Sequence, residues 1–444
     1  MSLNHAVEGF SKMSKEQKLD WLISSYFDND ASVKEQISHF WHRFQETQEV
    51  LDGFSENVIS NHYLPFSVAP NFLIDGEIKT LPMVIEESSV VAAASSAAKF
   101  WLTRGGFKTK VISTVKLGHV HFTWSGSMEM LKAEEENIFS YLKDEVADLV
   151  INMEKRGGGI RSLKFKDFSE QLGDVFQLEA SFETCDSMGA NFINTVLEAF
   201  GTALEDFINE TEIFPENYRD ADIIMCILSN YTPECLVRVE VSCPLDQLGG
   251  PINEKSAKTL AYRFKKAVDI ARTDTYRAVT HNKGIFNGID AIVLATGNDF
   301  RAIEACGHAF AAKDGTYRSL SYCEIENNVF RFYMDIPLAL GTVGGLTALH
   351  PMSKIALKIL GQPSAQQLMR YTAALGLAQN FAAVKSLVTT GIQHGHMRMH
   401  LQNIINHLGI KGEEAKKVES YFADKKISFS AVRAFAESGF NVVN

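Results

Sequence analysis

The 444-residue sequence lacks several features that would each point to a common class of protein. It has no run of about 18 apolar residues, so no membrane-spanning helix is expected. Its N-terminus has no basic segment followed by an apolar one, so we expect no secretory signal peptide. Acidic residues outnumber basic ones by 54 to 43, and the net charge of −11 argues against nucleic-acid binding.

The usual nucleotide and metal motifs are missing as well. No G-x-G-x-x-G follows a predicted strand, and neither a Walker A motif nor H-E-x-x-H occurs. The six cysteines are scattered without a C-x-x-C pair, which is typical of reduced thiols in a cytoplasmic protein. With 45% hydrophobic and 22% charged residues, the composition predicts a globular protein with room for about two or three domains.

The stretch from Thr280 to Ala305 holds the most informative residues. Lys283 stands between an asparagine and a glycine, Asp299 follows Thr-Gly-Asn, and the apolar run 289–295 joins them. A lysine aimed into a closed site polarises a carbonyl and stabilises the resulting oxyanion, and a nearby aspartate would keep it charged. Spacing alone nevertheless favours a loop lysine and an aspartate that caps a helix.

Two further groups carry possible chemistry. Glu86 and Glu87 follow an apolar strand predicted at 81–85, where a raised pKa would make a carboxyl a proton donor, although a solvated helix N-terminus suits them equally. His394, His396 and His400 form H-x-H-x3-H. That spacing suits zinc, but no cysteine cluster completes the site, and solvated helix histidines are the simpler interpretation.

The hydrophobic pattern predicts alternating helices and strands along the chain. Residues 110–230 have the order β-α-β-β-α-β of a ferredoxin-like unit. Predicted helices cover 15–27, 33–51, 90–102, 127–155, 191–208, 257–272, 300–312, 352–360, 365–375 and 377–388, with further helices after 393. Predicted strands cover 81–85, 108–124 as a strand or hairpin, 160–168, 175–184, 221–228, 237–241, 317–324 and 329–336, and 62–78 is expected to be irregular.

Several motifs together resemble 3-hydroxy-3-methylglutaryl-coenzyme A (HMG-CoA) reductase, in the soluble bacterial form often called class II. THNKG at 280–284 and ATGND at 295–299 carry the resemblance first. The others follow in the family's order: ENVIS at 56–60, EESSVVAAAS at 86–95, DSMGAN at 186–191, ILSN at 227–230, TVGG at 342–345, GLAQN at 376–380 and GIQHGHM at 391–397.

This resemblance implies an α+β fold. A large, mainly helical domain would carry an inserted ferredoxin-like βαββαβ domain and a mobile C-terminal helical flap. The expected divisions are 1–109 and 231–390 for the large domain, 110–230 for the small nucleotide-binding domain and 391–444 for the flap. The family is dimeric with active sites at the subunit boundary, so a cytoplasmic homodimer or assembly of dimers is expected, without a nucleic-acid or membrane partner.

The resemblance also implies a four-electron reduction of HMG-CoA to mevalonate and free coenzyme A, or the reverse oxidation. NADH or NADPH would serve without a metal, and Asp148 and Lys155 leave both nucleotides open. The implied catalytic residues are Glu87, Lys283, Asp299 and His396. The implied substrate-binding residues are Ser89, Asn230, Arg277 and Asn287. The implied cofactor-binding residues are Asp186, Met188, Gly189, Ala190, Asn191, Val343 and Gly344.

The sequence departs from the family pattern at two places. Ser88 stands where the family usually has proline after the catalytic glutamate, and Leu346-Thr347-Ala348 differs from the usual residues after TVGG. Two other functions stay open. One is a metal-dependent hydrolase that uses His394, His396 and His400, and the other is a non-catalytic protein that binds acyl-coenzyme A.

Overall fold

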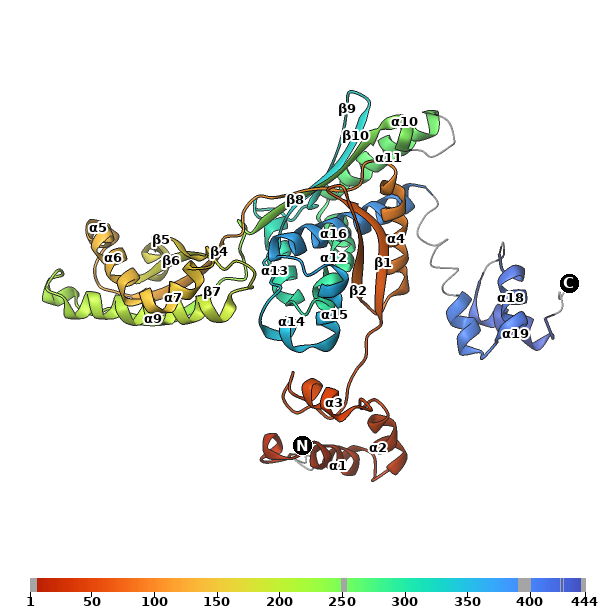
Figure 1. Cartoon of the computed structure of the whole chain (residues 1–444), viewed down its shortest axis with the longest axis horizontal. Coiled ribbons are helices and arrows are strands. Elements are labelled where there is room, and N and C mark those ends of the chain that lie inside the picture. Colours follow the sequence, from red (N-terminus) through yellow and green to blue (C-terminus); the bar gives the residue numbers. More distant parts are fainter. Residues whose placement is uncertain (1–5, 249–253, 390–400, 424, 426, 441–444) are drawn as a thin grey trace.

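The computed structural model describes residues 6–248, 254–389, 401–423, 425 and 427–440. Figure 1 shows a central body with a small domain on one side and C-terminal helices on the other, while the N-terminal helices stand below it. Three separate hydrophobic clusters form the cores of the body, the small domain and the C-terminal helices. Within the described residues, no helix has the length and apolar character needed to cross a membrane.

The central body combines two small antiparallel sheets with long helices. One sheet pairs β1 with β2, and the other has the order β3-β8-β10-β9. The strands are β1 Phe66–Ile74, β2 Glu77–Val84, β3 Lys108–Val111, β8 Leu236–Pro244, β9 Ser321–Glu326 and β10 Val329–Pro337. The helices are α4 Ser88–Leu102, α10 Leu245–Leu248, α11 Glu254–Thr273, α12 Thr275–Ala295, α13 Phe300–Ala311, α14 Gly345–Leu349, α15 Pro351–Ile359 and α16 Ala365–Val388.

Helices α12 and α16 cross closely at the centre of this body because glycines lie at the contact. A Cβ added to Gly288 of α12 would lie 2.7 Å from the carbonyl oxygen of Leu375. A Cβ added to Gly376 of α16 would lie 2.8 Å from Cγ1 of Ile289. Both additions would meet atoms closer than packed side chains allow, so the two glycines set the separation of the helices.

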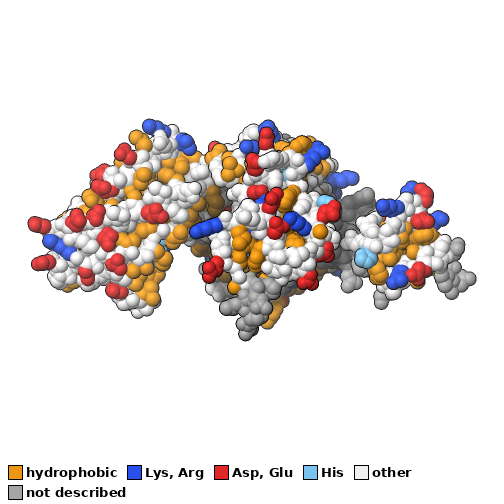
Figure 2. Space-filling model, turned by 90° about the horizontal axis from the view of Figure 1, so that it is seen from below, with side chains coloured by type: hydrophobic (Ala, Val, Ile, Leu, Met, Phe, Trp, Pro, Cys, Tyr) orange, Lys and Arg blue, Asp and Glu red, His pale blue; other side chains and the backbone are white. Residues whose placement is uncertain are grey.

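The small domain has the predicted ferredoxin-like topology, with strand order β5-β6-β4-β7 and antiparallel pairing throughout. Alternate residues of β4 are buried, and acidic side chains are spread over the face of the domain seen in Figure 2. Its strands are β4 Lys116–Thr123, β5 Gly159–Asp167, β6 Val175–Glu183 and β7 Asp222–Leu228. Its helices are α5 Met128–Ala133, α6 Glu135–Glu145, α7 Ala147–Glu154, α8 Ser169–Leu172, α9 Ala190–Glu210 and η2 Glu216–Tyr218.

Both ends of the chain form small helical groups. We call residues 6–62 the N-terminal arm. It contains η1 Phe10–Lys12, α1 Lys15–Tyr26, α2 Ala31–Ser38 and α3 Gln45–Asp52. The C-terminal group contains α18 Gly412–Tyr421 and α19 Phe429–Glu437, which pack around their own apolar core.

Several predicted elements were wrong in detail. The irregular stretch expected around 62–78 contains β1, in which Pro70 lies at a break in the strand register between Ala69 and Phe72. A proline is tolerated where the ladder is interrupted, so it does not exclude a strand there. The hairpin considered for 108–124 is also wrong, because β3 belongs to the large sheet and β4 to the small domain. The predicted division at residue 110 therefore falls inside β3.

The helix boundaries differ for tertiary reasons. The predicted helix 33–51 is two helices, because the chain turns where the Trp41 indole donates to the carbonyl of Ile59 at 2.8 Å. The predicted helix 127–155 is three, with turns at Glu134 and Val146. Conversely, the helices predicted at 365–375 and 377–388 are one continuous helix, α16, because Gly376 lies at a helix contact.

Candidate active site

Lys283 lies in the middle of α12 rather than in a loop. Lys283, Asn287 and Asp290 follow the spacing i, i+4 and i+7, so they lie along one face of the helix. Burial and the charge of Glu304 raise the pKa of Asp290 to about 8, while the charge of Lys283 acts in the opposite direction. The ammonium of Lys283 therefore interacts electrostatically with the carboxyl of Asp290.

Arg277 and His281 lie one turn apart near the start of α12. Burial lowers the pKa of Arg277. Burial also lowers the pKa of His281 to about 3, and the charge of Arg277 contributes in the same direction. His281 Nε2 lies 2.7 Å from the Ser321 hydroxyl, which donates to Asn380 at 2.8 Å. His281 and Asn380 therefore connect α12 and α16 to β9.

Glu87 and Ser89, predicted to act on the substrate, are direct neighbours. Glu87 occupies the position before α4, and its side chain does not cap the helix. The hydroxyl of Ser89 donates a short hydrogen bond to the carboxylate of Glu87. The strand β2, which ends shortly before Glu87, packs against α12.

Asp299 is the N-cap of α13, as the simpler interpretation of the sequence proposed. Its carboxylate accepts the backbone N–H groups of Arg301 at 3.0 Å and Ala302 at 3.3 Å. The guanidinium of Arg301 also donates to both carboxylate oxygens, at 3.0 and 2.9 Å. Burial raises the pKa of Asp299, but these hydrogen bonds outweigh it and hold the pKa below its usual range.

The three predicted catalytic residues Glu87, Lys283 and Asp299 come from adjacent elements. Both β2 and α13 contact α12. Within the part of the chain that the structure describes, no hydrogen bond directly joins these three side chains to one another. The expected interaction of Asp299 with Lys283 stays a prediction.

Three motifs distant in sequence are joined by hydrogen bonds at one place. The side-chain amide of Asn298 donates to the carbonyl of Gly341 at 3.0 Å and accepts the Gly341 N–H at 2.8 Å. The N–H of Thr342 donates to the carbonyl of Asp186 at 2.8 Å. The carboxylate of Asp186 accepts the N–H of Ala365 at 2.7 Å, which ties the small domain to α16.

The same junction brings the two predicted cofactor loops together. Ser187 and Val343 pair as an isolated parallel β-bridge. A Cβ at Gly341 would lie only 2.5 Å from the backbone nitrogen of Met188, so the two loops touch through their backbones. Gly344 adopts φ 82° in open space, which leaves this end of the loop free to accommodate a ligand.

The start of α9 is suited to an anion. Gly189 precedes it with φ 91°, and an added Cβ would lie 2.4 Å from Cγ2 of Thr184. No side chain caps this end, and the first turn holds no acidic residue. The first backbone N–H groups, at Ala190 and Asn191, therefore face outward at the positive end of a 21-residue helix.

A cleft lies between the small domain and the central body. It contains the predicted cofactor residues Met188 and Ala190 and the predicted substrate residue Asn230. Residues of α13 form the opposite wall, directly after Asp299. The full lining is Lys116, Met188, Ala190, Ile193, Leu228, Ser229, Asn230, Thr232, Ala302, Ile303, Cys306 and Ala339.

The histidine motif lies outside the described residues. His394, His396 and His400 fall within 390–400, so neither the predicted acid His396 nor the zinc alternative has a structural account. Among the residues that are described, no group of three or more histidine, cysteine or acidic side chains is arranged to hold a metal ion.

Sequence reasoning missed three charged residues near this site: Lys116, Arg301 and Glu304. Lys116 had a readable signal, because it occupies the buried phase of β4 where apolar residues are expected. The sequence signal for Arg301 was weaker: its side chain can reach back two residues to Asp299. No sequence signal marked Glu304, because its proximity to Asp290 depends on how α13 packs against α12.

A ferredoxin-like domain is thus joined to the central body by a cleft that residues at the start of α9 and residues of α13 line together. A family model described as hydroxymethylglutaryl-coenzyme A reductase matches residues 16–401. The chain therefore belongs to the HMG-CoA reductase family, in its bacterial class II form, and is an NAD(P)H-dependent oxidoreductase.

Named relatives agree with this assignment. The chain is 35% identical to the 3-hydroxy-3-methylglutaryl-coenzyme A reductase of Archaeoglobus fulgidus, over 98% of this chain and 95% of the relative. A solved reductase from Streptococcus pneumoniae has a TM-score of 0.71 and 33% identity, covering 99% of this chain and all of that chain. A second Streptococcus pneumoniae structure, a class II reductase bound to NADPH in open conformations, has a TM-score of 0.69 and 34% identity, covering 88% of this chain and all of that one.

Proposed function

We propose that this protein reduces the thioester of HMG-CoA to mevalonate and free coenzyme A, or catalyses the reverse oxidation. The observation that carries this proposal is the hydrogen-bonded junction of the loops at 186–189, 298 and 341–343. It places the predicted nucleotide loops next to the helix α13 that begins at the predicted catalytic aspartate.

The start of α9 fits the pyrophosphate of a nicotinamide dinucleotide. Gly189 allows close approach, and the free N–H groups of Ala190 and Asn191 can donate to phosphate oxygens. Asp186 and Met188 would position this loop, and Val343 and Gly344 would cover the nicotinamide end. Two reduced nucleotides, bound one after the other, would each supply one hydride, one for each reduction stage.

The residues of the large domain would act on the acyl group. The Lys283 ammonium would donate to the thioester oxygen as negative charge develops there. Glu87 would protonate the alkoxide of the second stage, and its hydrogen bond with Ser89 already orients the carboxylate. His396 would protonate the departing coenzyme A thiolate.

The remaining predicted residues would bind and orient the substrate. The half-buried guanidinium of Arg277 suits the free carboxylate of the hydroxymethylglutaryl group, because two parallel hydrogen bonds can form. Asn287 lies one turn after Lys283 and could accept or donate at the substrate hydroxyl. Asn230 lines the cleft on the small-domain side.

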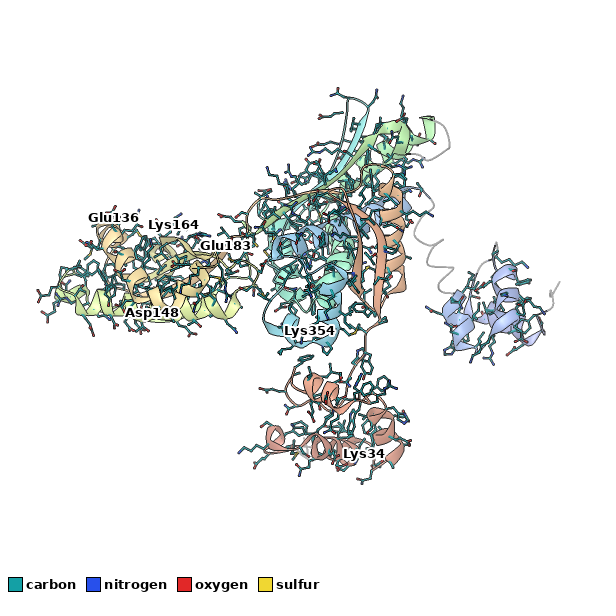
Figure 3. The ribbon with its side chains drawn as sticks, viewed as in Figure 1. Lys34, Glu136, Asp148, Lys164, Glu183 and Lys354 are labelled. Carbon is teal, nitrogen blue, oxygen red and sulfur yellow. The ribbon has the colours of Figure 1, made fainter. Side chains whose placement is uncertain are left out.

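The test is an absorbance assay of NADH or NADPH oxidation with HMG-CoA, comparing wild type with Lys283→Ala. We expect kcat to fall at least about 100-fold, as when an oxyanion donor is lost. Lys354→Ala, which removes an exposed lysine of α15 (Figure 3), is the matched control and should behave as wild type. Undiminished turnover by Lys283→Ala would contradict the assigned role.

The same assay separates the two other functions. A metal-dependent hydrolase would release coenzyme A without oxidising the nucleotide, and the purified protein would contain stoichiometric metal. A non-catalytic binding protein would bind HMG-CoA but leave the absorbance of the reduced nucleotide unchanged.

We further propose a cytoplasmic homodimer, or an assembly of dimers, with each active site at a subunit boundary. The N-terminal arm supports this, because its helices extend below the central body (Figure 1), which it contacts through the stacked rings of Phe54 and His350, and it exposes Phe40 and Phe44 by 53 and 57%. All six cysteines are free thiols, which supports a reducing compartment. We retain 230 and 390 as proposed domain limits, and we place the first limit after β3, at Val111, because β3 belongs to the large sheet.

A further inference from the structure

Lys116 is a buried lysine in the wall of the cleft. It is the first residue of β4 and only 4% exposed, on the same face of the strand as Gly118 and Val120. Burial raises the pKa of Cys235 to about 11, and the charge of Lys116 opposes that rise. The ammonium therefore lies near the start of β8, where the small domain joins the central body.

Among the described residues, no acidic side chain forms an ion pair with this ammonium. It donates a hydrogen bond to the carbonyl of Thr114, at 3.3 Å. The carboxylate of Glu183 is nearby but accepts the N–H of Cys185 at 2.8 Å and a short hydrogen bond from the Thr114 hydroxyl. No salt bridge within 4 Å involves Lys116 in the described parts of the chain. A desolvated charge without a counter-ion is unfavourable, so an anion is expected to complete the site.

A second positive feature faces the same space. Ala190 and Ile193, in the first turn of α9, line the cleft together with Lys116. A Cβ at Gly118 would lie 3.1 Å from Ile193, so β4 runs directly beneath this end of the helix. The helix dipole and the ammonium repel each other there, and no acidic residue in the first turn of α9 neutralises them.

We propose that Lys116 donates to a phosphate oxygen of the nicotinamide dinucleotide, together with the first backbone N–H groups of α9. This inference rests on the proposed function, because it assigns a further contact within the same nucleotide site. A phosphate at this position would neutralise the ammonium and accept from the helix start at once. Lys116 would thereby contribute to nucleotide affinity and not to the chemistry at the thioester.

The experiment measures dinucleotide affinity by the fluorescence of NADPH and of NADH. Lys116→Met keeps the length of the side chain without its charge, and Lys116→Arg keeps the charge. Lys164→Met makes the same change at an exposed position of β5 in the same domain (Figure 3) and is the matched control. We expect Lys116→Met to raise Kd about tenfold and to flatten its dependence on salt, with KM for HMG-CoA within about twofold of wild type.

An unchanged dinucleotide Kd in folded Lys116→Met overturns the inference. A variant that loses affinity for free coenzyme A but not for NADPH also overturns it, because the phosphate would then belong to the other ligand. If the wild-type protein does not oxidise a reduced nucleotide in the presence of HMG-CoA, the proposed function is wrong. The fluorescence measurement of the dinucleotide Kd still tests the role of Lys116 independently.

A second measurement needs no substitution, in case Lys116→Met does not fold. Wild-type protein is reductively methylated with and without NADPH, and the modified peptides are quantified by mass spectrometry. NADPH should protect Lys116 and leave Lys164 equally labelled. Equal labelling of Lys116 in both samples contradicts the inference.

Discussion

At the scale of single residues, two acidic side chains, Asp290 and Glu304, lie close together near Lys283. Asp290 Oδ1 is buried, and no donor reaches it among the described residues. The charge of nearby Glu304 adds to the effect of burial on Asp290. Both favour the protonated form of Asp290 near Lys283.

We expect the raised pKa of Asp290 to make the free energy of unfolding depend on pH. Burial, followed by the charge of Glu304, raises the pKa of Asp290 from 3.8 to about 8 in the folded protein. Because the folded state binds the extra proton, the free energy of unfolding falls as pH rises between these values, by up to about 1.4 kcal/mol per pH unit. Asp290→Asn keeps a hydrogen-bonding amide but cannot ionise, so its unfolding free energy should fall less over this window.

The measurement is thermal or urea-induced unfolding at several values between about pH 5 and about pH 8. Asp144→Asn removes an exposed carboxylate of α6 and serves as the control. The difference between Asp290→Asn and wild type should grow with pH and then level off. Parallel curves for the two proteins would show that Asp290 ionises normally in the folded state.

At the scale of elements, the crossing of α12 and α16 positions the substrate residues. α12 carries Arg277, Lys283 and Asn287, and its close contact with α16 depends on Gly288. Since packed interiors do not yield easily, moving the helices apart would displace all three side chains together.

We predict that Gly288→Ala lowers the free energy of unfolding by about 1–3 kcal/mol, because its methyl group would overlap the Leu375 backbone. Gly284→Ala is the matched control in the same helix, since an added Cβ there meets nothing within 4 Å. Alanine favours helix over glycine, so Gly284→Ala should be neutral or stabilising by up to about 1 kcal/mol. Urea unfolding of both variants measures the contrast, and equal losses would exclude the crossing as the cause.

At the scale of the whole molecule, the proposed subunit-boundary site can be tested by complementation. Lys283→Ala removes the proposed oxyanion donor of the large domain. Gly189→Ala puts a side chain at a position with φ 91°, where it would also overlap Thr184, and so disrupts the proposed nucleotide site of the small domain. If each site combines halves from two subunits, a mixed dimer of the two variants contains one intact site. Co-expression should then restore about a quarter of wild-type activity when subunits pair at random.

Differently tagged subunits establish that mixed dimers form, and size-exclusion chromatography with light scattering gives their mass. Each variant alone is the control and should show little turnover. Mixed dimers without restored activity would place both halves of the site in one subunit.

Much of the fold was predictable because it depends on local patterns. The alternation of β4 and the long apolar stripe of α9 indicated the ferredoxin-like domain, and its topology is confirmed. The misjudged elements share a different cause. Pro70 is accommodated at a break in register, Gly376 packs inside a helix, and Trp41 turns the chain by bonding to a distant carbonyl. Each depends on a partner that the local sequence does not contain.

By itself, the sequence determined the types and order of the reactive residues, because motifs such as THNKG and DSMGAN are contiguous. Only the tertiary structure decided which side chains meet. It paired Asp299 with Arg301, placed Glu304 against Asp290 and left Lys116 buried without an acid. Charge pairing and desolvation act through space over a few ångströms, so they depend on how the helices and domains pack and not on distance along the chain.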